Sequence, residues 1–184
     1  MIKLISPTLD PTVINQAAGQ VSTTKNALNG NENLEAAKQQ ASQSLGSLDN
    51  LNNAQKQTVT DQINGAHTVD EANQIKQNAQ NLNTAMGNLK QAIADKDATK
   101  ATVNFTDADQ AKQQAYNTAV TNAENIISKA NGGNATQAEV EQAIKQVNAA
   151  KQALNGNANV QHAKDEATAL INNSNDLTKH RKMH

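Results

Sequence analysis

The residues best suited to chemistry lie near the carboxyl end of the chain, where His162, Asp165 and Glu166 follow an H-x-x-D-E pattern. On a helix, His162 and Glu166 are four residues apart and share a face, as two ligands of one metal ion would. A zinc site needs a third and a fourth ligand, and the sequence offers none nearby. The pattern therefore favours a solvated helix face over a metal site.

Catalysis has equally little support in the sequence. His67 precedes a threonine that can cap a helix, which indicates a loop residue. The sequence contains no cysteine, no Ser–His–acid arrangement, no glycine-rich phosphate loop and no carboxylate pair to nominate as acid and base. We therefore expect no enzyme activity, no catalytic or metal residues, and no cofactor.

The composition predicts helices around a thin core. Hydrophobic residues make up 36% of the 184 positions, 31 residues are Ala, and Phe105 and Tyr116 are the only aromatic residues. Ala is the best helix former and contributes little to a β-sandwich. A net charge of −1 and the scarcity of aromatics argue against nucleic acid as a partner. No apolar run approaches the ~18 residues that a membrane span needs, so we expect any export and anchoring signals to lie outside this chain. We also expect the chain to be a monomer.

A long-period repeat organises the chain. The pentapeptide ALNGN occurs at 27–31 and again at 153–157, and the surrounding residues 16–51 and 142–177 share 15 identities in 36 positions. The repeat period is thus 126 residues, and the chain holds about one and a half units of an array. The proline-containing start, residues 1–12, and the tail, residues 180–184, are expected to be disordered or vector-derived.

The strongest helix prediction runs from Val69 to about Asp97. Its apolar residues follow an unbroken 3-4 spacing, and Thr68 with Glu71 forms a capping box at its start. Such a helix is ~43 Å long at 1.5 Å per residue, about twice the length that a small bundle needs. We therefore expect it to serve two bundles in succession. The stripe consists of Ala72, Ile75, Ala79, Leu82, Met86, Leu89 and Ile93.

Further helices are expected on both sides of it. Upstream, apolar spacing predicts helices over 34–48 and 53–64. Downstream, one helix should start at Asp107 behind a Thr106–Asp109 cap, and another behind a Thr136–Glu139 cap. The first of these carries an alanine stripe, and a left-handed glycine near Gly132 is expected to end it. No β-branched alternation predicts a strand, so the fold class is all-α: tandem three-helix bundles joined by a long shared helix, forming an elongated rod. The alanine stripe on the helix expected from Asp107 consists of Ala108, Ala111, Ala115, Ala119, Ala123, Ile126 and Ala130.

The ALNGN copies are expected to end the last helix of one bundle and to open the first helix of the next. Gly30 or Gly156 supplies a permissive backbone, and Asn31 or Asn157 can cap the helix of the next bundle. Since Gly inside a helix costs only ~1 kcal/mol, the chain could either break or only kink there.

Two module families resemble parts of the chain. Residues 31–85 resemble the GA module through Leu34, Ala37-Lys38, Ala41 and the INGAHTVDEANQI segment at 63–75. Residues 86–156 resemble the FIVAR module through Tyr116 within YNTAVTNAENIISKANG and through QAEVEQAIKQVNAAKQALNG. Their alternation in a 126-residue unit is similar to giant staphylococcal cell-wall proteins of the extracellular-matrix-binding class. The resemblance implies that residues 13–30 are the last helix of a preceding FIVAR module and that residues 157–179 are the first helix of the next GA module.

This resemblance implies a cell-surface stalk with a role in adhesion and cell-envelope integrity. In albumin-binding GA modules a tyrosine pair contributes to the binding face; here those positions hold Thr58 and Val59. Fibronectin is therefore favoured over albumin as a host ligand. The candidate partner-binding residues are Val59, Phe105 and Tyr116, with the Tyr116 ring expected to be partly buried and its hydroxyl wet.

Three functions are weighed. The first is a non-enzymatic stalk whose value lies in length and resistance to unfolding. The second is a discrete binding module for a plasma or matrix protein, which weak contacts repeated along an array could support. The third, an enzyme, would need a pocket that such thin bundles can hardly enclose.

Overall fold

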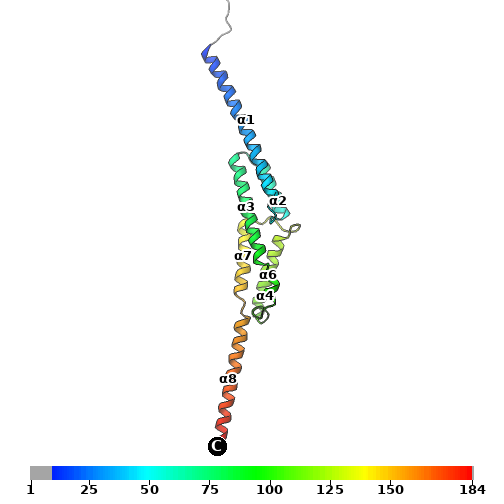
Figure 1. Cartoon of the computed structure of the whole chain (residues 1–184), viewed down its shortest axis with the longest axis vertical. Helices are drawn as coiled ribbons and strands as arrows, with labels where there is room; N and C mark the ends of the chain where they lie inside the picture. The colour runs from blue at the N-terminus through cyan, green and yellow to red at the C-terminus, as the bar shows by residue number, and fades with distance from the viewer. Residues whose placement is uncertain (1–9, 184) are drawn as a thin grey trace, which may run out of the picture. The chain divides into compact units, whose positions relative to one another are not determined.

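The structure, a computed structural model, describes residues 10–183; expectations for residues 1–9 and 184 fall outside this range. These residues form helices and no strand, which confirms the all-α class (Figure 1). The helices are α1 (Pro11–Gly46), α2 (Asn53–Gly65), α3 (Val69–Ala92), α4 (Lys96–Lys100), α5 (Val103–Thr106), α6 (Gln110–Ile127), α7 (Gln137–Gln152) and α8 (Gly156–Lys182).

The described residues divide into two compact units that interleave in sequence. Unit 1 comprises residues 10–48 and 59–79, and unit 2 comprises residues 49–58 and 80–183. Both α2 and α3 therefore contribute residues to both units. The sharing of α3 confirms the expectation of a long helix that serves two bundles.

Helix α1 starts earlier than the sequence indicates and is one continuous helix that ends at Gly46. Asp10 caps it by accepting a hydrogen bond of 3.0 Å from the Thr12 N–H, and Pro11 occupies the first turn, where its missing donor is harmless. The helix therefore begins inside the range expected to be disordered. It then continues through Gly30 without interruption, which joins the separately expected helices 13–30 and 34–48 into one (Figure 1).

Unit 1 is a small bundle of the second half of α1, the end of α2 and the start of α3. Its core contains Ala37, Ala66 and Ala72, against which Val69 and Ile75 pack. Small side chains let the helices approach closely but bury little apolar area each. The remaining buried hydrophobic residues of this unit are Ala41, Leu45, Leu48, Val59, Ile63 and Ala79.

Helix α3 begins as predicted and ends earlier. The Glu71 N–H donates to Thr68 Oγ1 at 3.1 Å, and the carboxylate of Glu71 accepts from the His67 N–H at 2.9 Å. The expected end near Asp97 is wrong, because the chain turns at 93–95 before α4. The turn buries Ile93 and places Asp95 beside Lys151 of α7.

Unit 2 is a larger bundle of the end of α3 with α6 and α7. Helix α6 spans Gln110–Ile127, so the expected span from Asp107 to Ala130 is too long at both ends. Asp109 is its N-cap, while Thr106 belongs to α5. The predicted alanine stripe is also partly wrong, because Ala111 and Ala115 are exposed. The face through Tyr116 and its neighbours is buried instead, since larger side chains remove more apolar surface from water. The buried α6 residues are Tyr116, Ala119, Val120 and Ala123.

Gly132 has a role different from the predicted one. No glycine in residues 10–183 has a positive φ, so the expected left-handed helix end is wrong. Helix α6 ends instead at Ser128, whose φ of −58° and ψ of 119° turn the chain out of the helix. Gly132 provides space: a Cβ there would lie 2.5 Å from Asn52 Nδ2 and 2.6 Å from the Ile126 carbonyl oxygen.

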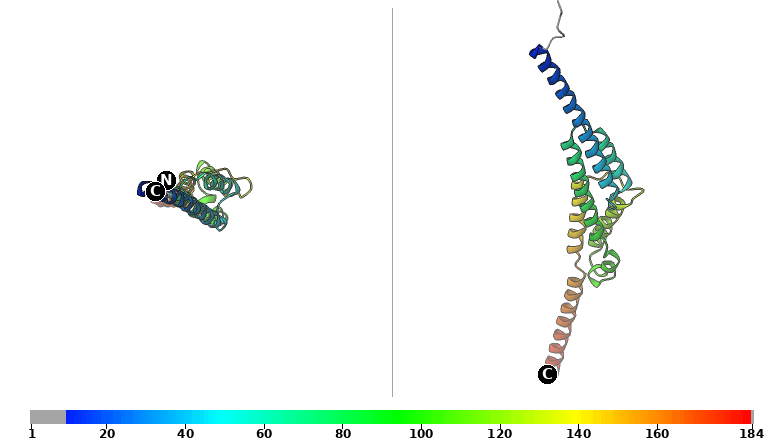
Figure 2. Two further views of the ribbon diagram at one scale, coloured as in Figure 1. Left: turned by 90° about the horizontal axis from the view of Figure 1, so that it is seen from above. Right: turned by 45° about the horizontal axis from the view of Figure 1, so that its top comes forward.

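The two copies of ALNGN adopt different backbones. The copy at 27–31 lies inside α1, whereas the copy at 153–157 separates α7 from α8. The interruption between α7 and α8 is visible in Figure 1 and in the right-hand view of Figure 2. Helix α8 then extends to Lys182, which includes His180–Lys182 of the expected tail. Of the helices in residues 10–183, none combines the length and apolar character needed to cross a bilayer.

Candidate functional site

The three candidate partner-binding residues do not form one exposed patch. Val59 is buried in unit 1, and Tyr116 is buried in unit 2 with none of its surface exposed. Phe105 on α5 is half-buried and packs edge-on against Tyr116, with ring centroids 5.9 Å apart and planes inclined at 66°. In this structure Phe105 alone among the three presents part of its side chain to solvent.

The Tyr116 hydroxyl is buried rather than wet, contrary to expectation. No described residue forms a hydrogen bond with it. The ring anchors the core of unit 2, and the T-shaped contact with Phe105 is a favourable aromatic geometry. Tyr116 thus acts through packing, and its unpaired hydroxyl is an energetic penalty that the rest of the core tolerates.

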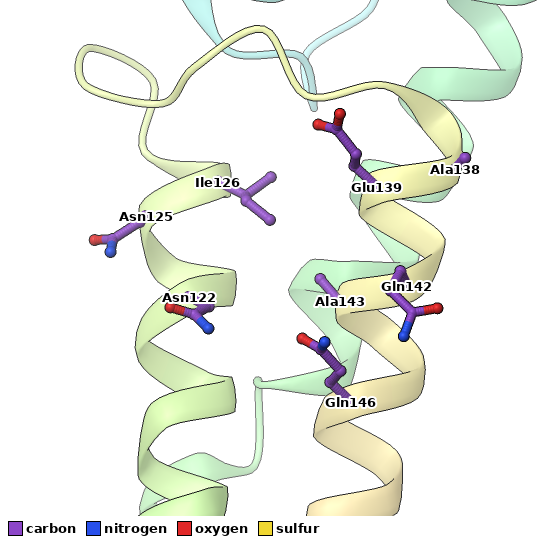
Figure 3. Close-up of a pocket in the computed structure, with 8 residues that line it drawn as sticks. All are labelled: Asn122, Asn125, Ile126, Ala138, Glu139, Gln142, Ala143 and Gln146. Atoms are coloured by element: carbon purple, nitrogen blue, oxygen red, sulfur yellow. The ribbon is translucent and has the colours of Figure 1, made fainter.

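Unit 2 has a groove between α6 and α7. Ile126 of α6 points toward Ala143 and Gln146 of α7 across it, and Asn122 of α6 also lines it (Figure 3). Its lining is completed by Asn125, Ala138, Glu139 and Gln142. An apolar floor between amide-bearing rims suits a polar chain laid along it, such as an extended peptide backbone, because amides donate and accept hydrogen bonds.

The groove carries no catalytic arrangement. Glu139 is its one ionisable lining residue, and its carboxylate is engaged at the start of α7, where it accepts from the Thr136 N–H at 3.4 Å. The Thr136 hydroxyl in turn accepts from the Glu139 N–H at 3.2 Å, so the predicted capping box is confirmed. Among the lining residues, the groove therefore has no second ionisable group to pair with Glu139 as acid and base.

The histidine pattern of the sequence forms an exposed helix-face pair. His162 Nε2 lies 3.1 Å from a carboxylate oxygen of Glu166, and both side chains are largely exposed. Within residues 10–183 there is no cluster of three or more His, Cys, Asp or Glu side chains that could hold a metal ion.

A buried amide pair, Asn52 and Gln55, is the feature that sequence reasoning missed. Asn52 Nδ2 donates to the carbonyl oxygens of Ile126 and Gly133, each at 2.9 Å. Gln55 Nε2 donates to the Ala135 carbonyl at 3.0 Å. We call this pair the amide latch, because it ties residues 49–58 to the α6–α7 connection within unit 2.

The amide latch is also a helix cap. The Gln55 N–H donates to Asn52 Oδ1, and the Asn52 N–H donates to Gln55 Oε1, both at 2.9 Å. This is the reciprocal pattern of a capping box with Asn and Gln in place of Thr and Glu. The N-x-x-Q spacing before α2 could therefore have revealed it.

Two ion pairs join the α3–α4 turn to the other helices of unit 2. Lys151 binds Asp95, and Lys96 binds Glu124. The hydrogen bond from Lys151 lowers the pKa of Asp95 against a smaller opposing effect of desolvation, and the same bond raises the pKa of Lys151. The hydrogen bond to Glu124 likewise raises the pKa of Lys96. All four side chains keep substantial solvent contact, so each pair adds modestly to stability.

Comparisons with protein families match two kinds of module. The FIVAR domain matches residues 3–29 and 85–155, more than half of the chain, and the GA module matches residues 31–85. The two FIVAR matches lie on either side of the GA match, so the modules alternate.

Curated relatives match nearly the whole chain. It is 97% identical over 96% of its length to "Extracellular matrix-binding protein EbhA" of Staphylococcus aureus strain Newman, of which it covers 5%. It is equally similar to "Extracellular matrix-binding protein ebh" of strain NCTC 8325 / PS 47, of which it covers 2%. The chain thus spans a small fraction of the length of these relatives.

Two solved structures share the fold. A crystal structure of EbhA residues 756–1003 from Staphylococcus aureus is 46% identical, with a TM-score of 0.82, over 90% of this chain and 69% of the other. A second structure concerns Embp-mediated adherence of Staphylococcus epidermidis to fibronectin; it is 26% identical, with a TM-score of 0.63, over 67% of this chain and 98% of the other.

Proposed function

The chain belongs to the FIVAR domain family and carries a GA module, and on this premise we propose that it is a non-enzymatic, load-bearing stalk repeat of a bacterial adhesin displayed on the cell wall. Its relatives are extracellular matrix-binding proteins many times its length. A segment that is repeated along such a chain contributes chiefly by extending the protein and by resisting unfolding, and it thereby supports attachment and envelope integrity.

The continuity of α3 is the observation that carries this proposal. The helix runs unbroken from Val69 to Ala92 and supplies buried residues to unit 1, such as Ala72, and to unit 2, such as Leu89. Tension that enters one unit along α3 therefore reaches the other through the hydrogen bonds of this one continuous helix. The two units should consequently resist force together.

Single-molecule pulling of the full chain tests this idea. Thr84 is exposed and lies in α3 just after its residues pass from unit 1 to unit 2. Thr84→Pro removes a helical hydrogen bond and clashes with the preceding turn, which costs ~3 kcal/mol. We expect lower unfolding forces and two separated unfolding events, whereas Thr84→Ala should behave like the unchanged chain. An unchanged force profile for Thr84→Pro would refute the load-bearing role of α3.

The α6–α7 groove supports a second candidate function, that of a discrete binding module. Its amide rims and apolar floor suit a polypeptide ligand, and the Embp relative is linked to fibronectin adherence. Fibronectin is therefore the ligand to test first. Albumin is disfavoured because Val59, which replaces a tyrosine of albumin-binding GA modules, is buried.

Binding should be measured on immobilised fibronectin and albumin, with the chain as a monomer and as a clustered multimer. Binding by the multimer but not by the monomer would support adhesion through avidity. If neither form binds, the result would favour the stalk role alone. Monomer binding that is lost in Gln146→Ala, but not in Gln161→Ala on exposed α8, would place a ligand in the groove.

A further inference from the structure

The pentapeptide ALNGN has two conformations in one chain. At 27–31 it is helical, and every one of its residues is exposed. At 153–157 its first three residues are not α-helical, and α8 begins only at Gly156. Because the five residues are identical, the difference must come from their surroundings.

The second copy is held by a set of hydrogen bonds to the segment that precedes α6. The Asp109 N–H donates to Asn155 Oδ1 at 3.0 Å, and Asn155 Nδ2 donates to Asp109 Oδ2 at 2.9 Å. Asn159 Nδ2 donates to the Asp107 carbonyl at 3.0 Å and to Asp109 Oδ1 at 3.2 Å. The Asn157 N–H donates to Asn104 Oδ1 at 3.1 Å. We call Asn155, Gly156, Asn157 and Asn159 the asparagine clasp.

Gly156 makes the contact possible by lacking a side chain. It is buried, and a Cβ at this position would lie 2.1 Å from the Val103 carbonyl oxygen and 2.6 Å from that of Asn104. Both neighbours are backbone atoms, which cannot move aside without shifting α5. Gly30 in the first copy, by contrast, has no atom within 4 Å of the equivalent position.

The first copy carries every residue of the clasp. Asn29, Gly30, Asn31 and Asn33 stand where the second copy has Asn155, Gly156, Asn157 and Asn159, with nothing docked on them. The helix that precedes them is equivalent to α7, because both stretches match the FIVAR domain. Five further identities precede the pentapeptides, namely Gln16, Ala17, Gln20, Val21 and Lys25, each matched 126 residues later.

We propose that Asn29, Gly30, Asn31 and Asn33 can form the same clasp, and that the helix breaks at this point when the Asn104–Asp109 segment of the FIVAR module that ends in this pentapeptide lies beside it. Gly and Asn are poor helix formers, so the helix at this position is easily exchanged for a clasped turn. The side-chain amides then bind the carboxylate at the position of Asp109 instead of water. ALNGN thus has two conformations: it is helical where that segment is absent and a clasped turn where the segment lies beside it.

The matched glycines give a direct test in the full chain. Gly156→Ala places a methyl group against the α5 backbone, so we expect the clasp to open and residues 153–156 to become helical, as judged by their Cα chemical shifts. Gly30→Ala meets open space and should leave the shifts of 27–31 unchanged. Shifts at 153–156 that remain non-helical in a folded Gly156→Ala chain would overturn the proposal.

A second pair of variants distinguishes opening of the clasp from unfolding of the whole module. Asp109→Ala removes the carboxylate that the clasp binds, whereas Asp107→Ala leaves the clasp intact, because only the Asp107 carbonyl is used. We expect helical shifts at 153–156 in the first variant and not in the second, with the Tyr116 signals of the core retained in both. Identical shifts in the two variants would contradict the role of Asp109.

Formation of the clasp is tested in a lengthened chain in which residues 1–155 are followed by residues 30–184. The middle ALNGN then follows a complete FIVAR module and precedes the sequence that continues α1 in the present chain. We expect this middle copy to be non-helical, and Asp109→Ala in the module before it should restore its helical shifts. A middle copy that stays helical in the unsubstituted lengthened chain would overturn the proposal.

Discussion

Replacing one amide of the latch should destabilise unit 2 far more than is usual for a polar residue at the start of a helix. Asn52 immediately precedes α2 with no exposed surface, and its side chain makes three hydrogen bonds. Asn52→Ala removes all three and leaves the Ile126 and Gly133 carbonyls and the Gln55 N–H without this partner. The adjacent Asn53→Ala is the matched control, because Asn53 is exposed and bonds Lys129 through its backbone.

The size of the effect can be worked out from those bonds. At about 1 kcal/mol net for each hydrogen bond, Asn52→Ala should lower the free energy of unfolding of unit 2 by about 3 kcal/mol. This corresponds to roughly a hundredfold change in the unfolding equilibrium constant. With a urea dependence of about 1–3 kcal/mol per M, the transition midpoint should fall by roughly 1–3 M. The control should stay within about 0.5 kcal/mol of the unchanged chain.

The chain contains its own probe for this measurement. Tyr116 is the only tyrosine, there is no tryptophan, and Tyr116 lies in the core of unit 2. Tyrosine fluorescence in urea therefore follows unit 2, while circular dichroism follows all helices. If Asn52→Ala shifts the fluorescence transition no more than Asn53→Ala does, the latch does not stabilise unit 2 and the reasoning fails.

Three further predictions use the same urea titration. Gly132→Ala should lower the free energy of unfolding by about 1–3 kcal/mol, because the added methyl group overpacks the core. Gly133→Ala, whose methyl group meets open space, should leave it unchanged. Equal effects of the two substitutions would contradict the close approach at Gly132. Tyr116→Phe, followed by circular dichroism, should be neutral or stabilise by up to about 1 kcal/mol, since it removes an unpaired buried hydroxyl; a clear loss would reveal a partner for that group. Folding lowers the pKa of Asp95 below its ordinary 3.8, so its ion pair stabilises unit 2 above about pH 4 and is lost as pH falls through the lowered pKa. Asp95→Asn should therefore weaken the acid dependence of stability, and Asp176→Asn on exposed α8 should not.

Helix type and helix starts are predictable because they depend on neighbours in sequence. The caps at Thr68 and Thr136 are recognisable from a hydroxyl followed three residues later by Glu, and both form the expected hydrogen bonds. The apolar spacing of α3 likewise indicates a helix long enough for two bundles. These features need no knowledge of distant residues.

Features set by distant contacts are not predictable in the same way. The buried face of α6 is chosen by Tyr116 and Val120, because their larger side chains fill the core better than the alanine stripe does. The amide latch depends on carbonyls more than 70 residues away in sequence. The two conformations of ALNGN depend on whether the Asn104–Asp109 segment is present beside it, which no local pattern encodes.

The shared helix α3 also determines how the protein can be divided into fragments. The GA and FIVAR matches meet at Ala85, which is buried inside α3 and precedes Met86, a residue with no exposed surface. An expressed fragment that ends there loses residues 86–92 of α3 and separates Asn52 and Gln55 from the carbonyls they bind. A fragment from Gly30 to Asn159 would instead keep both the amide latch and the asparagine clasp. In this family the boundary of a sequence module is therefore a poor place to divide the chain, and the natural unit for recombinant work is the interval between two ALNGN copies.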